Sequence, residues 1–263
     1  MIVLSGASAH ALQTHWVDTE GGRMRLSIDP TPAADGLTHG ALEIDLDADW
    51  KTYWIDPGST GIPPLVDLTG SQGITLKSMR LPAPVRIDDG YSIWAGYKQS
   101  VAYALTFERD GAAMLRATVF VGICDKICVP FQAKFSLDLP APENVNQSAI
   151  AAKGVIERAN ASLPNQSRED FAITSATLSE DENSLVVSVR VPLDDRSTTR
   201  PELFAAAKGW FFGQPEEKSN GQGTGTIHIP VKMKPKSLTM VEAPIYFVLT
   251  YGGQAVEADL TVN

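Results

Sequence analysis

The chain has no apolar run long enough to span a bilayer and no excess of basic residues. Its formal net charge is −9, and the acidic groups are spread along all 263 residues. A membrane helix needs about 20 consecutive apolar residues, and binding to nucleic acid or anionic lipid needs clustered basic residues. We therefore expect a globular chain that does not insert directly into a membrane and has no nucleic acid as its partner.

Histidine and cysteine, the usual ligands of zinc and other transition metals, are also scarce. The four histidines (His10, His15, His39 and His228) are scattered without the spacing of a metal site. A metal held by two thiolates would need further ligands nearby, because structural sites for zinc use four. We expect neither a metal nor a cofactor.

Cysteine occurs only twice, as Cys124 and Cys128, in one short segment. The flanking stretches Leu115–Ile123 and Phe131–Leu139 are rich in β-branched and aromatic residues, which is typical of strands. Pro130 would break a helix but is tolerated at a strand edge. The pattern predicts a β-hairpin whose two strands end at the cysteines. Residues that face each other across an antiparallel pair have Cα atoms about 4.5–5.5 Å apart, within the range of a disulfide, so we expect a Cys124–Cys128 bond.

Such a bond would close a very short loop. In the chain-entropy model, a loop of about five residues adds only about 2 kcal/mol of stability, and a large domain obtains more than that from its core. A small ring is also more easily reduced than a bridge over a long loop. These arguments favour a redox-active dithiol, with a passive hairpin disulfide as the alternative.

The first eleven residues resemble the end of a secretory signal peptide. Ala7, Ser8 and Ala9 fit an A-x-A-type cleavage site, while the basic start and most of the apolar segment are missing. A flexible start is the alternative. Because disulfides persist in oxidising compartments, we expect an exported, periplasmic protein whose signal peptide is truncated.

Short alternating or apolar segments, separated by Pro- and Gly-rich turns, occupy most of the chain and predict an all-β fold of β-sandwiches. The expected strands are Arg23–Ile28, Thr38–Leu46, Ile74–Leu81, Ser100–Glu108, Ala113–Ile123, Phe131–Leu139, Phe171–Leu178, Ser184–Val191, Thr224–Val231, Ile245–Tyr251 and Ala255–Val262.

The segment 147–161 differs from the rest in having the composition of a helix. It divides the chain into a first domain (12–142), a helical linker (143–165) and a second domain (166–263). A further short helix is expected at Glu202–Trp210. The second domain holds no cysteine and no evident catalytic cluster, so we interpret it as a scaffold or spacer.

Aromatic residues of the first domain gather at Trp50–Trp54 and Tyr91–Tyr97. For the first group, a place in the core and a place in the site both remain open. The second group follows a turn and has glycine and polar neighbours, which indicates a loop. An aromatic loop beside a reactive dithiol would act as a lid. The residues of this candidate cap loop are Asp88, Asp89, Tyr91, Ile93, Trp94 and Tyr97.

Together these motifs resemble the amino-terminal periplasmic domain of the DsbD thiol–disulfide reductases, and most of all its ScsB-like branch. The resemblance covers residues 15–140 well and the second domain more weakly. The motifs, in chain order, are Trp50-x2-Tyr53-Trp54-x2-Pro57-Gly58, Leu81-Pro82-Ala83-Pro84, Asp88-Asp89-x4-Trp94-x-Gly96-Tyr97 and Gly122-x-Cys124-x3-Cys128-x-Pro130.

The resemblance implies immunoglobulin-like sandwiches and a catalytic pair formed by Cys124 and Cys128. It implies that Cys128 forms the mixed disulfide with a partner, and that the segment 88–97 caps the pair. The implied partners are a membrane-embedded thiol reductase as electron donor and periplasmic thioredoxin-fold proteins as acceptors. Full-length members also carry a membrane domain and a thioredoxin domain, so we expect either a fragment or a protein with a separate electron donor.

A second hypothesis belongs to a different functional class. Two sandwich domains with a structural disulfide would form a non-catalytic periplasmic interaction module. The ScsB-like branch is associated with copper tolerance, but one cysteine pair without nearby methionine or histidine is a poor copper site.

Overall fold

The computed structural model describes residues 12–58, 61–88, 90–142, 150–192, 200–219, 223–234 and 244–262. The expected signal segment (1–11) and Asp89 lie outside the described residues.

The chain forms two compact units that interleave along the sequence. The first comprises Met1–Thr52, Pro64–Pro82 and Lys98–Leu163, and the second comprises Tyr53–Pro63, Ala83–Tyr97 and Pro164–Asn263. Two short segments of the amino-terminal half of the chain, 53–63 and 83–97, thus belong to the same unit as the carboxy-terminal sandwich.

The first unit is a β-sandwich built around one long strand. Its strands are β1 (Val17–Thr19), β2 (Gly22–Ile28), β3 (Thr38–Leu46), β4 (Lys51–Tyr53, which ends at the unit boundary), β5 (Leu65–Asp67), β6 (Gln72–Arg80), β9 (Val101–Cys124) and β10 (Cys128–Leu139).

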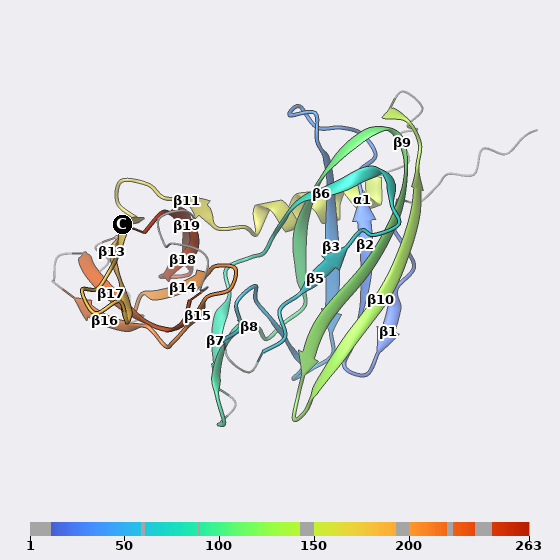
Figure 1. The fold of residues 1–263 in the computed structure, drawn as a ribbon. Helices are drawn as coiled ribbons and strands as arrows, with labels where there is room; N and C mark the ends of the chain where they lie inside the picture. The colour runs from blue at the N-terminus through green and yellow to red at the C-terminus, as the bar shows by residue number, and fades with distance from the viewer. Residues whose placement is uncertain are drawn as a thin grey trace, which may run out of the picture. The chain divides into compact units, whose positions relative to one another are not determined.

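Strand β9 joins the two layers of this sandwich. The sequence predicted two strands where the structure has one, with an irregular register against β6 between the pairs Ile74↔Arg109 and Gln72↔Met114. Within this bend Gly111 has φ +62°, a conformation that glycine adopts without strain. The first part of β9 pairs with β3 and β6, and the second part pairs with β10, β5 and β4. The long β9–β10 hairpin is visible in green in Figure 1.

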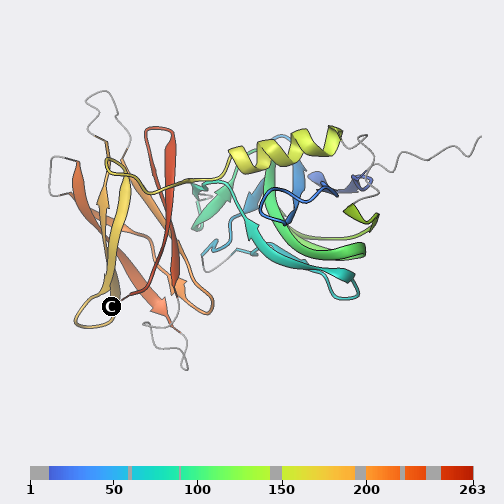
Figure 2. The same ribbon diagram turned by 90° about the horizontal axis from the view of Figure 1, so that it is seen from above.

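The predicted helix is present as α1 (Ile150–Ala161). Its buried residues Ala152, Val155, Ile156 and Ala159 follow the i, i+3, i+4, i+7 spacing of one helix face. This face packs on β2, β3 and β9, along the first unit (Figure 2). The helix therefore adds to the core of the first sandwich.

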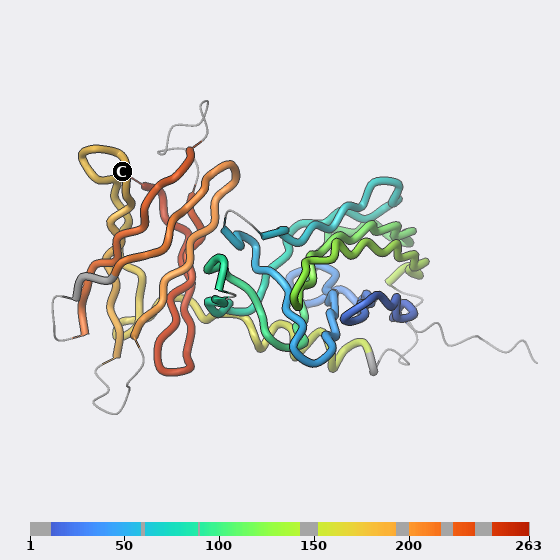
Figure 3. The backbone as a smooth tube through the Cα atoms, turned by 90° about the horizontal axis from the view of Figure 1, so that it is seen from below, coloured from blue at the N-terminus to red at the C-terminus, as the bar shows by residue number. Residues whose placement is uncertain are grey.

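The second unit contains the carboxy-terminal sandwich, whose two sheets have the strand orders β11-β19-β18-β14 and β12-β13-β17-β15, with β16 also pairing with β17. Figure 3 follows the backbone through these strands, from yellow to red. They are β11 (Asn165–Gln166), β12 (Ala172–Leu178), β13 (Ser184–Arg190), β14 (Glu202–Ala206), β15 (Phe211–Phe212), β16 (Glu216–Ser219), β17 (Thr224–Met233), β18 (Ile245–Tyr251) and β19 (Gln254–Leu260).

Apolar side chains of both sheets, among them Ile173, Leu185 and Phe247, form the core of this sandwich. The prediction of two β-sandwiches is confirmed, whereas the prediction of a helix at Glu202–Trp210 is wrong. The residues of that segment have helical composition, but β14 pairs with β18 and buries Leu203 and Phe204. Among the described residues, no helix combines the length and apolar character that crossing a membrane requires.

Candidate functional site

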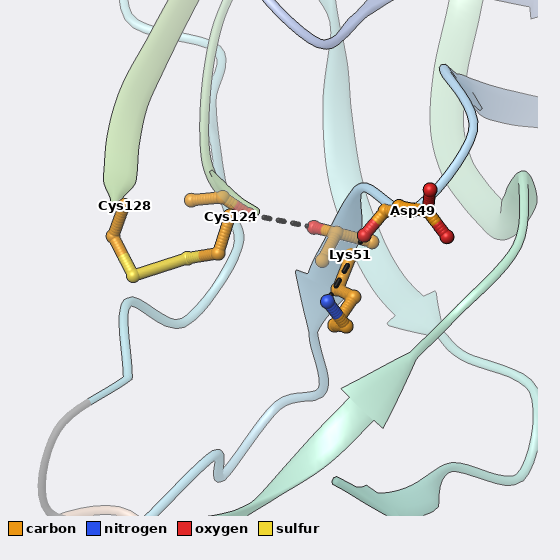
Figure 4. Close-up of a disulfide and its surroundings, with 6 residues drawn as sticks. Asp49, Lys51, Cys124 and Cys128 are labelled. Carbon is orange, nitrogen blue, oxygen red and sulfur yellow. Dashed lines mark hydrogen bonds between the residues drawn. A yellow bond between two sulfur atoms is a disulfide. The ribbon is translucent and has the colours of Figure 1, made fainter. Parts of the chain in front are cut away.

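The two cysteines form a disulfide at the turn of the β9–β10 hairpin. Cys124 is the last residue of β9 and Cys128 the first of β10, and they are directly paired. Their Cα atoms are 4.2 Å apart and their sulfurs are bonded (Figure 4). The intervening turn is closed by the amide of Asp125, which donates to the carbonyl of Ile127 over 3.2 Å. Both the predicted hairpin and the predicted bond are confirmed.

The two cysteines differ strongly in exposure. Cys124 is only 4 % exposed, because it lies between β10 on one side and β4 on the other, where it pairs with Lys51. Cys128 is exposed, as are the turn residues before it, and Ile127 is 68 % exposed. The expectation that Cys124 is the more buried of the two is confirmed. Cys128 is therefore the more accessible of the two cysteines.

A buried hydrogen-bond chain supports the end of β9. The Thr52 hydroxyl donates to the carbonyl of Gly122 over 2.8 Å, two residues before Cys124. Because Thr52 has a single hydroxyl proton, its oxygen accepts from Tyr103, which lies earlier on β9. Burial raises the pKa of Tyr103 above its ordinary value, so this hydroxyl keeps its proton. The chain of bonds fixes β4 against both parts of β9.

Lys51 and Thr52 are the residues that the sequence analysis missed. The segment Trp50–Trp54 drew attention for its aromatic residues, but nothing in its pattern showed which strand it pairs with. The weak signal available was the lysine itself, a charged residue between aromatic neighbours. Its backbone pairs with Cys124, and its ammonium donates to the carbonyl of Asp49 over 2.9 Å (Figure 4).

The candidate cap segment is a β-hairpin, and the prediction of a loop over this segment is wrong. Strands β7 (Val85–Asp88) and β8 (Ile93–Tyr97) are antiparallel, with Ile87 paired to Trp94. At the turn, the Gly90 amide donates to the Asp88 carboxylate over 2.8 Å.

The cap candidates separate into buried and exposed side chains. Trp94 is 3 % exposed and lies against Tyr53, with ring centroids 4.5 Å apart; Tyr97 is also buried. Tyr91 is 99 % exposed and Ile93 is 43 % exposed. The hairpin belongs to the second unit and the cysteine pair to the first, so shielding of the dithiol by this hairpin stays a prediction.

Elsewhere in the described part of the chain, no three His, Cys, Asp or Glu side chains lie together in a way that could hold a metal ion. One acidic side chain has a strongly shifted pKa. Burial raises the pKa of Asp56 to about 6, although its carboxylate accepts from the Gly58 amide over 3.0 Å. Asp56 lines a cleft of the second unit together with Arg86 and Trp94.

Comparisons with known proteins agree with this geometry. The family model for the amino-terminal part of thiol:disulfide interchange protein DsbD matches residues 27–140. The N-terminal periplasmic domain of ScsB from Proteus mirabilis has the same fold, with a TM-score of 0.69 and 18% identity over 97% of this chain and 99% of that one. A marsupial T cell receptor, matched over 92% of this chain and 97% of its own, has 12% identity and a TM-score of 0.21, which supports no argument. No curated protein sequence matches. Residues 27–140, which include the Cys124–Cys128 disulfide, are therefore a domain of the DsbD amino-terminal family.

Proposed function

We propose that this protein is a thiol–disulfide exchange protein of the periplasm that relays electrons through the Cys124–Cys128 pair. The observation that carries the proposal is the asymmetry of the disulfide, in which a buried cysteine at the end of β9 is bonded to an exposed one at the start of β10. One reachable sulfur and one sheltered sulfur are what an exchange through a mixed disulfide requires.

In the reduced protein, the Cys128 thiolate attacks the disulfide of an acceptor. One acceptor sulfur becomes bonded to Cys128, and the other leaves as a thiolate that takes up a proton. Cys124, having lost its own proton, then attacks the Cys128 sulfur. The Cys124–Cys128 bond forms, the mixed disulfide breaks, and the second acceptor sulfur leaves as a thiolate. Two electrons pass to the acceptor, and the two thiol protons of the cysteines balance the two that the acceptor thiols gain.

A second dithiol must restore the reduced state by the reverse steps. The family resemblance supports a membrane-embedded thiol reductase as this donor and periplasmic thioredoxin-fold proteins as acceptors. The turn around Cys128 supports a protein acceptor, because its exposed apolar side chain, Ile127, offers a contact surface beside the reacting sulfur.

The roles of the two cysteines can be tested by trapping. Cys124→Ser leaves Cys128 without its resolving partner, so this variant should accumulate a mixed disulfide with a thioredoxin-fold protein, visible on a non-reducing gel. Cys128→Ser should accumulate little, because Cys124 is buried. Equal trapping by both variants, or trapping through Cys124 alone, would show that the roles are assigned wrongly.

The reduction potential separates this proposal from the structural-disulfide alternative. Equilibration of the pair against glutathione or dithiothreitol buffers gives the potential directly. A value well above about −300 mV is expected for a carrier, whereas structural bridges of exported proteins lie below it. A pair that stays oxidised in these buffers would favour the interaction module.

A further inference from the structure

The carbonyl of Gly122, two residues before the end of β9, lies where the hydrogen-bond ladder along one side of that strand is interrupted. The pairing of β9 with β4 stops at Thr52↔Ile123. The pairing with β5 starts at Leu65↔Phe120. Gly122 falls between these two ladders and is buried. A buried carbonyl in such a gap needs another donor, because a buried acceptor without a partner lowers the stability of the fold.

The strand on the other side, β10, offers this carbonyl no donor. The Cα atoms of Cys124 and Cys128 are 4.2 Å apart, which is the short spacing of a pair that exchanges no backbone hydrogen bonds. Such pairs alternate with bonded pairs along an antiparallel ladder, so Gly122 and Pro130, two positions further, form another pair of this kind. Proline also has no amide proton to donate. The Gly122 carbonyl therefore points away from β10 and towards the side of β4.

The side chain of Thr52, on β4, supplies the missing donor. Its hydroxyl donates to the Gly122 carbonyl over 2.8 Å and accepts from the hydroxyl of Tyr103. Both side chains are buried. Tyr103 pairs with Leu42 of β3, in the opposite layer of the sandwich, so the two bonds cross the core and meet the end of β9. A buried polar network whose members have their partners makes the surrounding structure rigid.

This support of β9 matters most when the disulfide is open. In the oxidised protein the Cys124–Cys128 bond itself holds the two strand ends together. In the reduced protein, and in a mixed disulfide at Cys128, the contacts of β9 alone must keep Cys124 within reach. Ring closure is faster and more favourable when the attacking group is already held near its target.

We propose that Thr52 is a positioning residue for Cys124. Its hydroxyl, oriented by Tyr103, keeps the end of β9 in place in the reduced protein. It thereby sets both the rate at which Cys124 attacks the mixed disulfide and the reduction potential of the pair. The inference rests on the proposed function, in which Cys124 resolves a mixed disulfide formed at Cys128, and it makes two hydroxyls of the core part of the redox site.

Reaction of the reduced full chain with dithiobis(nitrobenzoate) measures the resolving step without a protein partner. The Cys128 thiolate attacks the disulfide of the reagent, so that one thionitrobenzoate leaves and the other stays bonded to Cys128. The Cys124 thiolate then attacks the Cys128 sulfur, forms the Cys124–Cys128 bond and releases the second thionitrobenzoate, while the two thiol protons pass to the buffer. The first release depends on the reagent concentration and the second does not, so the absorbance trace separates them.

Three variants and one control divide the contributions to this step. Thr52→Val removes the hydroxyl and keeps the shape of the side chain, whereas Thr52→Ser keeps the hydroxyl. Tyr103→Phe removes only the outer bond of the chain. Thr38→Val is the matched control, because Thr38 is as buried as Thr52 but pairs with Phe107, near the bend of β9 and away from its cysteine end.

We expect the second release to be about tenfold slower in Thr52→Val, with the first release unchanged. Loss of the hydroxyl lets the end of β9 relax in the reduced protein, while the disulfide still holds it in the oxidised one. In glutathione buffers the equilibrium constant for closing the disulfide should therefore fall about tenfold, which raises the reduction potential by about 30 mV. Thr52→Ser and Thr38→Val should match the wild type, and Tyr103→Phe should show a smaller change in the same direction.

An unchanged second release in Thr52→Val, in a protein that melts cooperatively, would overturn the inference, as would an equal slowing in Thr38→Val. If Thr52→Val does not fold, Tyr103→Phe decides the question by the same two measurements.

The trapping experiment separates failure of this inference from failure of the proposed function. If Cys124→Ser traps an acceptor but the second release in Thr52→Val is as fast as in the wild type, only the positioning role is wrong. If Thr52→Val slows the second release while no acceptor is trapped, the positioning role holds and the relay is wrong.

Discussion

Lys51 on β4 and Cys124 on β9 are directly paired across two antiparallel strands. Paired residues point to the same face of a sheet, with Cβ atoms about 5 Å apart. The Lys51 side chain therefore leaves the backbone on the same face as the side chain of the buried Cys124. Its ammonium is held by the carbonyl of Asp49 (Figure 4). When a thiolate attacks Cys128, the leaving group is the Cys124 thiolate. A nearby positive charge stabilises that thiolate.

The first prediction is that Lys51→Met slows reduction of the disulfide by dithiothreitol. A solvent-exposed charge pair is worth up to about 1 kcal/mol, which corresponds to roughly a fivefold slower reaction. Lys51→Arg should restore most of the rate, and the effect in Lys51→Met should persist when a protein with a dithiol replaces dithiothreitol as the reductant. Lys77→Met, which removes a charge on β6, is the control for net charge. Equal rates in Lys51→Met and Lys77→Met would remove Lys51 from the mechanism.

The second prediction is that the first sandwich stays folded when the disulfide is reduced. The β9–β10 ladder continues from the cysteines to the pair Leu139↔Ala113 without a break in register, so the bond crosslinks strands that are already fixed. The expected loss is about 2 kcal/mol. Thermal melts with and without reductant should both be cooperative, and the double variant Cys124→Ala, Cys128→Ala should melt like the reduced protein. Loss of cooperative unfolding on reduction would support the structural-disulfide alternative.

The cysteine hairpin could be predicted because its determinants are local. The β-branched runs, Pro130 and the short spacing all lie within one segment, and together they define the strands, the turn and the pairing. The pairing of Lys51 with Cys124 is a contact between residues far apart in the sequence. A three-residue strand such as β4 carries no pattern that identifies its neighbour. The cysteine pair was therefore visible in the sequence, while the residues around it were not.

Two wrong predictions also have physical causes. The segment Glu202–Ala206 contains good helix formers, but its burial between β18 and the core outweighs that weak preference. The glycines at 90 and 96 hid the strand at Ile93–Tyr97, because they gave the segment the composition of a loop. Its partners include Tyr53 and Trp54, about 40 residues earlier, and Gln214, more than 100 residues later, and local composition cannot reveal such contacts.

The third prediction concerns Asp56, whose pKa is raised to about 6 by burial. The folded protein binds this proton more tightly than the unfolded chain, whose pKa is near 3.8. The free energy of unfolding therefore falls as the pH rises from about 4 to about 6, and the full destabilisation by Asp56 is present at pH 7. Asp56→Asn removes the charge and keeps an acceptor for the Gly58 amide. The variant should gain about 3 kcal/mol at pH 7 and little at pH 4.

Urea unfolding between pH 4 and pH 7.5 checks this expectation. Asp67→Asn is a control for which the change in stability should have the opposite sign, because hydrogen bonds from Thr69 lower the pKa of the exposed Asp67 carboxylate. Removal of the Asp67 charge should lower the stability at neutral pH. If Asp56→Asn and the wild type lose stability in parallel across this range, Asp56 is not the group responsible.

The last prediction concerns Ile127, the exposed apolar residue between the two cysteines. It is 68 % exposed in a turn that adjoins the exposed Cys128. Interface energy concentrates in a few apolar or aromatic contacts at the centre of a docking surface. Ile127→Ser should therefore weaken exchange with a thioredoxin-fold acceptor and leave exchange with dithiothreitol unchanged, because the small reagent needs no docking surface. The expected change is a several-fold higher KM with a similar reduction potential.

Leu65→Ser is the matched control for this variant. Leu65 is also exposed, at 58 %, but it pairs with Phe120, four residues before Cys124. At about 3.3 Å per residue, this places it roughly 13 Å along the strand from the cysteine. An acceptor that docks on the turn should tolerate Leu65→Ser and discriminate against Ile127→Ser. Equal effects of the two substitutions would mean that the acceptor covers a wider face of the sheet. If Ile127→Ser slows exchange with dithiothreitol as much as it slows exchange with the protein acceptor, then Ile127 acts on the disulfide itself and has no role in recognition.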